Sequence, residues 1–280
     1  MWQKWCSIAL GTGISVYFAF GLLLYWGQNR LIFLPQRQIS STPDKFGLEY
    51  RDIWINIQQE KIHGWWIPQK EESAPVLLHF HGNASNNGDL MDNAVIFHKL
   101  GLSVLLVDYR GYGLSSPTFP NENRAYEDAT AAWQYLTETR KIKPEQIFVC
   151  GHSLGGAIAI ELARHNPQMA GLITEGTFTS IEEMARLNSL FALLPLSLIV
   201  NQRFDSISKI DSLQVPLLMF HGMNDETIPF SMGQELFDRA NEPKKFIPIA
   251  KAGHNNLHQI GRQEYIFHLQ QFIDSYRSIP

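Results

Sequence analysis

The residues from Gly151 to Gly155 read Gly-His-Ser-Leu-Gly, with an apolar run before them and a helical pattern after them. A serine on such a strand-to-helix turn has a strained backbone and an exposed hydroxyl, and the two glycines let neighbouring chain approach closely. The helix N-terminus favours developing negative charge, and the Leu154 amide can donate to an oxyanion there. The pattern therefore predicts Ser153 as a nucleophile rather than an ordinary turn serine.

A serine hydroxyl is a weak nucleophile, and it needs a base that an acid holds in place. Asp225 follows the apolar run Leu217–Phe220, and His254 follows the run Lys245–Ile249. Both residues fall where strands end, which is the side on which α/β proteins place their sites. We predict His254 as the base and Asp225 as the supporting acid.

Other residues compete for these two roles. Asp225 could serve as a helix N-cap, with Glu226 beside it as an alternative carboxylate. Glu175, which follows the run Leu172–Thr174, is a further acid. His258 is the main competitor to His254, but it falls where the next helix is expected to begin.

A second oxyanion donor is expected after the strand-like run Val76–Phe80, in the segment His81-Gly82-Asn83. Gly82 lets the backbone turn, so that the Asn83 amide can face the same point as the Leu154 amide. We interpret His81 as a structural hydrogen-bonding residue. His79 and His81 have no further ligands at useful spacing, so we expect neither a metal nor another cofactor.

A second loop, Asp108-Tyr109-Arg110-Gly111-Tyr112-Gly113, follows the run Val104–Val107. We interpret it as scaffold, in which Asp108 and Arg110 hold loops by charge-assisted hydrogen bonds.

The elements that must position these residues alternate between short apolar runs and helical patterns, which predicts an α/β fold with a mostly parallel sheet and helices on both faces. An antiparallel hairpin, Tyr50–Ile57 and Ile62–Ile67, should form one edge. The predicted helices are Asp89–Leu100, Asn121–Thr139, Gly155–Arg164, Met232–Asn241 and Gln263–Tyr276. An apolar insertion at 176–213 is either a small helical cap or a plain helix packed on the sheet.

No charged residue lies between Lys4 and Arg30, and aromatic residues flank the apolar stretch 5–27. A span of this length predicts one transmembrane anchor, since a bilayer needs about 20 residues, and it is long for a cleaved signal peptide. Residues 28–47 would form a stalk and residues 48–280 the catalytic domain. The basic residues on the two sides of the span do not settle its orientation.

The composition excludes one class of partner. A net charge of −4 and a pI near 6.2 provide no broad basic field for nucleic acid. Two cysteines, Cys6 and Cys150, build no disulfide framework.

Five motifs in one order resemble the membrane-anchored branch of the α/β-hydrolase superfamily: His81–Asn83, Asp108–Gly113, Gly151–Gly156, His221–Asp225 and Gly253–His254. The resemblance covers about residues 48–276. It implies a carboxylesterase, acyl-protein thioesterase or lysophospholipase-like activity without a cofactor. A peptidase or amidase on the same fold and a catalytically silent membrane scaffold are the alternatives. The span at 5–27 and the apolar stretch 190–200 favour a lipid or acylated substrate at a membrane.

Overall fold

The computed structural model describes residues 2–191 and 193–277. Within this part of the chain one eight-stranded sheet has the order β1-β2-β4-β3-β5-β6-β7-β8. The strands are β1 (Arg51–Ile57), β2 (Glu60–Ile67), β3 (Val76–Phe80), β4 (Ser103–Asp108), β5 (Ile147–His152), β6 (Gly171–Glu175), β7 (Leu217–Gly222) and β8 (Lys244–Ile249). The hairpin β1–β2 pairs antiparallel and forms an edge, and β4 to β8 pair in parallel through β3, as the sequence predicts.

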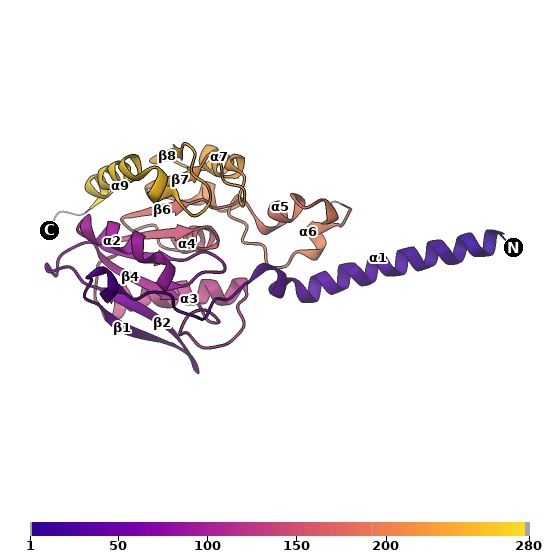
Figure 1. Cartoon of the computed structure of the whole chain (residues 1–280), viewed down its shortest axis with the longest axis horizontal. Coiled ribbons are helices and arrows are strands. Elements are labelled where there is room, and N and C mark those ends of the chain that lie inside the picture. The colour runs from indigo at the N-terminus through magenta and orange to yellow at the C-terminus, as the bar shows by residue number, and fades with distance from the viewer. Residues whose placement is uncertain (1, 192, 278–280) are drawn as a thin grey trace.

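Helices cover both faces of the sheet (Figure 1). The α-helices are α1 (Trp2–Ile32), α2 (Met91–Lys99), α3 (Glu122–Gln134), α4 (Leu154–His165), α5 (Ile181–Arg186), α6 (Leu196–Ile199), α7 (Phe230–Arg239), α8 (Leu257–Ile260) and α9 (Arg262–Tyr276). Short 3-10 helices occur at Pro43–Phe46, Asn87–Leu90, Pro144–Gln146, Ser189–Phe191 and Ile210–Ser212, and a π-helical turn at Tyr135–Thr139 ends α3.

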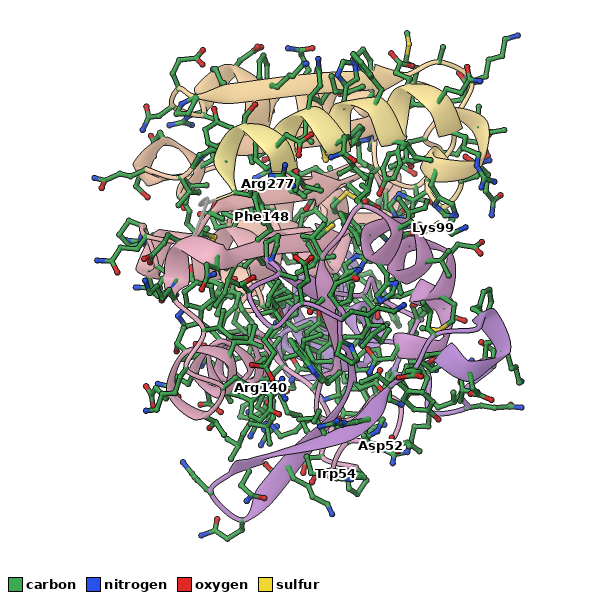
Figure 2. All side chains as sticks on the ribbon, turned by 90° about the vertical axis from the view of Figure 1, so that its left-hand side faces the viewer. Asp52, Trp54, Lys99, Arg140, Phe148 and Arg277 are labelled. Carbon is green, nitrogen blue, oxygen red and sulfur yellow. The ribbon has the colours of Figure 1, made fainter. Side chains whose placement is uncertain are left out.

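Successive side chains of the central strands enter two separate cores, because a strand alternates its faces. On β3, Leu78 packs into the core shared with α3, α4 and α7, whereas Leu77 packs into the core shared with α2 and α9. Figure 2 shows Phe148 of β5 close to the sheet interior, with Asp52 and Trp54 on the edge hairpin. The Phe148 ring meets Phe272 of α9 edge to face, with centroids 6.0 Å apart. The unbroken apolar strands are thus buried on both faces, as the sequence indicates.

The helix α1 contains the stretch predicted to span a membrane and projects from the domain (Figure 1). Among the described residues, no helix has both the length and the apolar character that crossing a bilayer requires. The transmembrane anchor predicted at 5–27 is therefore not supported.

Residues 28–47, which the sequence predicts as a stalk, make contacts with the domain. The helix α1 continues to Ile32, and residues 33–42, here named the N-terminal strap, lie against the domain. Phe33 is buried and meets Phe204 edge to face at 5.9 Å. The Asn86 side chain donates to the Gln38 carbonyl at 2.8 Å. Several polar groups of the strap therefore bond to the domain.

The insertion at 176–213 forms the short helices α5 and α6 and two 3-10 turns, and α5 and α6 lie beside α1 (Figure 1). The Tyr17 hydroxyl of α1 donates to the Leu193 carbonyl at 2.8 Å. The Gln28 side chain donates to the Ile199 carbonyl at 3.0 Å and accepts from the Asn201 amide at 2.8 Å. The insertion is thus held to α1.

Candidate active site

Ser153 stands at the turn between β5 and α4, with φ +54° and ψ −117°. This conformation is strained for any residue with a Cβ. A Cβ at Gly151 would lie 2.1 Å from the Gly155 carbonyl oxygen, and one at Gly155 would lie 2.2 Å from the Phe80 carbonyl oxygen. Only glycine fits at these two positions, so the motif permits the turn that raises the hydroxyl above the sheet.

His254 and Asp225 come from the loops after β8 and β7 and form a hydrogen bond of 2.7 Å between Nδ1 and Oδ2. A carboxylate only accepts, so Nδ1 carries the proton and Nε2 of the neutral ring has a free lone pair. The Thr227 and Ile228 amides donate to Asp225 Oδ1 at 2.9 and 2.8 Å. Burial opposes ionisation of this carboxyl, but hydrogen bonds from His221, His254 and the Ile228 amide outweigh it and lower the pKa of Asp225. Asp225 is therefore an anion that orients His254.

The other candidate acids and base are placed elsewhere. Glu226 is exposed. Glu175 is buried among neutral partners, accepting from the Asn93 side chain at 3.3 Å and from the Tyr265 hydroxyl. His258 stands on α8, 3.6 Å from an Asp92 carboxylate oxygen. None of these contacts joins a rival to His254, so among the candidate acids the structure brings Asp225 to the predicted base.

His152, the residue before the predicted nucleophile, contacts the base loop, which sequence reasoning did not foresee. Its Nε2 donates to the His254 carbonyl at 2.9 Å, and the two ring centroids are 4.8 Å apart. Burial and the neighbouring His254 lower the pKa of His152 to about 4. The ring is therefore neutral near neutral pH, and it supports the His254 backbone. Its position inside the motif was the available signal, but the sequence does not say which carbonyl it meets.

The segment His81-Gly82-Asn83 lies directly against the nucleophile turn. A Cβ at Gly82 would lie 3.3 Å from Ser153 Cβ and 2.9 Å from His152 Nδ1. The Asn83 side chain is fixed, since its Oδ1 accepts from the Leu34 amide at 2.9 Å and its Nδ2 donates to the Ile32 carbonyl at 2.5 Å. The segment that contains Asn83 therefore lies beside Ser153, and the oxyanion role of Asn83 and Leu154 stays a prediction.

A cavity of about 530 Å³ adjoins this site. Ser153 and His254 both line it, together with Asn83, Glu175 of β6 and Leu34 of the N-terminal strap. Among the described residues, none from the insertion at 176–213 lines it. A larger hollow, of about 870 Å³, lies between β1, α3 and α4 and does not include Ser153. The cavity of about 530 Å³ is therefore the one that can hold a substrate against the Ser153 hydroxyl.

The residues interpreted as scaffold are buried, and Arg110 bonds to carboxylates on α3 and β2. Arg110 contacts the carboxylates of Asp128 at 2.6 Å, Glu127 at 2.7 Å and Glu60 at 2.9 Å. Within the described part of the chain no group of three or more His, Cys, Asp or Glu side chains is arranged to hold a metal ion. His79 and His81 are both fully buried.

Comparison with known proteins gives one family and one fold. The model of the family described as serine aminopeptidase, S33, matches residues 71–209. The protein bem46 of Schizosaccharomyces pombe is 34% identical over 83% of this chain and 82% of its own length. The human alpha/beta hydrolase domain-containing protein 17B is 31% identical over 70% of this chain and 65% of its own length. The Pyrococcus furiosus esterase Pf2001 has a TM-score of 0.75 at 21% identity, covering 88% of this chain and 99% of that structure. At that identity the likeness is one of fold.

Proposed function

Because this chain belongs to the α/β-hydrolase superfamily, we propose that it is a serine hydrolase that cleaves carboxylic ester or thioester bonds through an acyl-enzyme. The observation that carries the proposal is the 2.7 Å bond from His254 to Asp225, with His254 and Ser153 lining one cavity. Members of this superfamily differ in chemistry, so the proposal depends on these residues and not on the fold.

In the first step Ser153 Oγ attacks the substrate carbonyl while His254 Nε2 takes its proton. Asp225 stabilises the imidazolium that forms. The oxyanion is held by the amides of Leu154 and Asn83, and His254 then gives its proton to the leaving alcohol or thiol. Water attacks the acyl-enzyme in the second step, and the same residues act in reverse order.

The test is labelling by a fluorophosphonate, which phosphonylates an activated serine with loss of fluoride. The proposal expects the wild-type protein to be labelled and Ser153→Ala not to be labelled. Exposed Ser208, which lies far from residue 153 in sequence and is absent from the cavity lining, offers the matched control Ser208→Ala. Unchanged labelling of Ser153→Ala would refute the assignment of the nucleophile. An unlabelled wild-type protein would favour a catalytically silent scaffold.

The matched family carries the description of an aminopeptidase, which makes an amidase the second candidate. A Ser-His-Asp site can cleave either bond type. Matched substrates with one acyl group, presented as an ester and as a peptide amide, separate the two. Faster turnover of the amide would replace the esterase proposal.

A lipid or acylated substrate is the class that we propose, because large apolar side chains are exposed on the two elements that project from the domain, α1 and the insertion. Large apolar side chains are exposed on α1 and on the insertion, among them Leu23 (71%), Leu190 (77%) and Leu193 (86%). Leu34 of the N-terminal strap is 56% exposed and also lines the cavity, so one exposed apolar side chain lies at the edge of the site. Such patches mark contact with lipid or with a partner.

Two measurements test this substrate class. The first compares kcat/KM over esters of rising acyl length, where a longer chain should raise kcat/KM. The second is co-flotation of the full chain with phosphatidylcholine vesicles, which Leu190→Ser with Leu193→Ser should weaken. The matched control is Leu114→Ser with Met223→Ser, two exposed residues outside that surface. Preference for short soluble esters, with equal flotation of both double variants, would contradict the proposal.

A further inference from the structure

The segment 81–87, here named the oxyanion loop, is hydrogen-bonded at its start, middle and end to the loop Asp108–Gly113. The Tyr109 hydroxyl donates to the His81 carbonyl at 3.0 Å, and the Tyr112 hydroxyl donates to Asn83 Oδ1 at 2.8 Å. Asp108 Oδ1 accepts from the backbone amide of Asn87 at 2.8 Å, which fixes the far end of the loop.

The two tyrosines that donate these hydrogen bonds are buried and closely packed, so their hydroxyls hold a fixed position. Tyr109 is 1% exposed and Tyr112 is fully buried. The His81 ring lies between them, with centroids 4.4 Å from Tyr109 and 5.1 Å from Tyr112. Burial raises the pKa of both tyrosines, so each hydroxyl remains a donor. A Cβ at Gly113 would lie 1.9 Å from an Asp108 oxygen, so the loop closes around its own carboxylate.

The Asn83 side chain connects the loop Asp108–Gly113 to the N-terminal strap. Its Oδ1 accepts from Tyr112 on one side and from the Leu34 amide on the other. Its Nδ2 donates to the Ile32 carbonyl at the end of α1. The backbone amide of Asn83 is the proposed oxyanion donor, and these hydrogen bonds fix the side chain of the same residue.

We propose that Tyr112 is a positioning residue for the reaction, acting through the Asn83 side chain to aim the Asn83 amide at the oxyanion. Tyr109 supports the same loop at His81. This inference rests on the proposed function, since it presumes acyl transfer at Ser153. It assigns a role to the motif Asp108–Gly113 that goes beyond general scaffolding.

The expected effect of Tyr112→Phe follows from the bonds that remain. The phenylalanine ring still fills the buried site of the tyrosine. Asn83 Oδ1 then accepts only from the backbone amides of Leu34 and Ala84. Outright loss of one oxyanion donor lowers kcat by about 10² to 10³, so a loosened donor should lower kcat by about tenfold. The substrate ground state does not rely on this donor, so KM should stay within about twofold.

The experiment measures kcat and KM on an activated ester, and inhibition by a trifluoromethyl ketone, whose hemiketal oxyanion occupies the same place as that of the reaction. Tyr112→Phe should weaken inhibition by the same factor by which it lowers kcat. A merely structural tyrosine would lower thermal stability without this matched loss. The control is Tyr126→Phe, which removes a hydroxyl bonded to Glu122 at 2.8 Å on α3.

A double-mutant cycle tests the route through Asn83, because Asn83→Ala keeps the backbone amide and removes the side chain. Tyr112→Phe should then cause no further loss in the Asn83→Ala background. Full kcat and full inhibitor affinity in Tyr112→Phe, or a raised KM alone, would overturn the inference while labelling of Ser153 upholds the proposed function. If Tyr112→Phe does not fold, Asn83→Ala alone carries the test: it should lower kcat and inhibitor affinity by the same factor, and full kcat with full inhibitor affinity would overturn the inference.

Discussion

Replacing Asp225 by asparagine changes the charge at the base without changing its shape. Two backbone amides, of Thr227 and Ile228, donate to Oδ1, and His254 Nδ1 donates to Oδ2. The carboxamide of asparagine has one oxygen that accepts and one nitrogen that only donates. The two amides select the orientation that keeps the oxygen at the Oδ1 position. The nitrogen must then face His254.

This orientation reverses the tautomer of His254. Nδ1 of the imidazole has to accept from the asparagine nitrogen, so the ring proton moves to Nε2. An Nε2 that carries a proton cannot take the proton of Ser153. By analogy with the same exchange in a serine protease, kcat should fall by about 10⁴, or roughly 5.4 kcal/mol at 1.36 kcal/mol per tenfold. The two amide bonds to Oδ1 survive, so the fold should remain intact.

The assay is kcat on an activated ester, together with thermal unfolding to confirm that the variant folds. Asp225→Ala is the companion variant, because it removes the acid without forcing the wrong tautomer, and it should retain more activity than Asp225→Asn. An Asp225→Asn variant that keeps more than a tenth of wild-type kcat would refute the reasoning, since His254 would then not need Asp225 to hold its proton at Nδ1.

Three further predictions follow from single contacts. Gly82→Ala places a Cβ 2.9 Å from His152 Nδ1, so kcat should fall by about 10- to 100-fold with the fold retained, as measured by ester turnover and circular dichroism. His79→Leu should lower the pH at which acid unfolds the protein. Burial lowers the pKa of His79 from 6.5 to about 3, so between these two pH values the unfolded state binds a proton that the folded state does not. Acid therefore destabilises the wild-type fold through His79, and leucine removes this effect. An unchanged acid midpoint would contradict this. Ser153→Gly should unfold at a higher temperature than Ser153→Ala, because the strained φ of +54° costs an alanine about 1 to 3 kcal/mol and a glycine little. Equal melting temperatures would show that the turn stores no strain.

Much of the fold could be predicted because its signals are local. The run Val76–Phe80 is a strand with those same bounds, since continuous apolar residues suit a strand buried on both faces. The turn at Ser153 follows from glycines whose need is steric, as the Gly151 and Gly155 contacts demonstrate. The pairing of Asp225 with His254 could be anticipated because both follow parallel strands that end at one edge.

The path of residues 28–42 could not be predicted, because the partners are remote in sequence. Gln28 bonds to Ile199, and the Asn83 side chain bonds to Leu34. A polar segment that contains proline has the same composition whether its polar groups meet water or a domain.

His152 links the two halves of the site. On one side its Nδ1 lies where a Cβ at Gly82 would come within 2.9 Å, and on the other its Nε2 donates to the His254 carbonyl at 2.9 Å. One ring therefore sets the spacing between the oxyanion loop and the base loop, and it does so from the position next to the nucleophile. That spacing has to remain constant while His254 gains and loses a proton. With a pKa of about 4, His152 stays neutral over the pH range in which an ordinary histidine changes charge, so its contacts do not change with the state of the base.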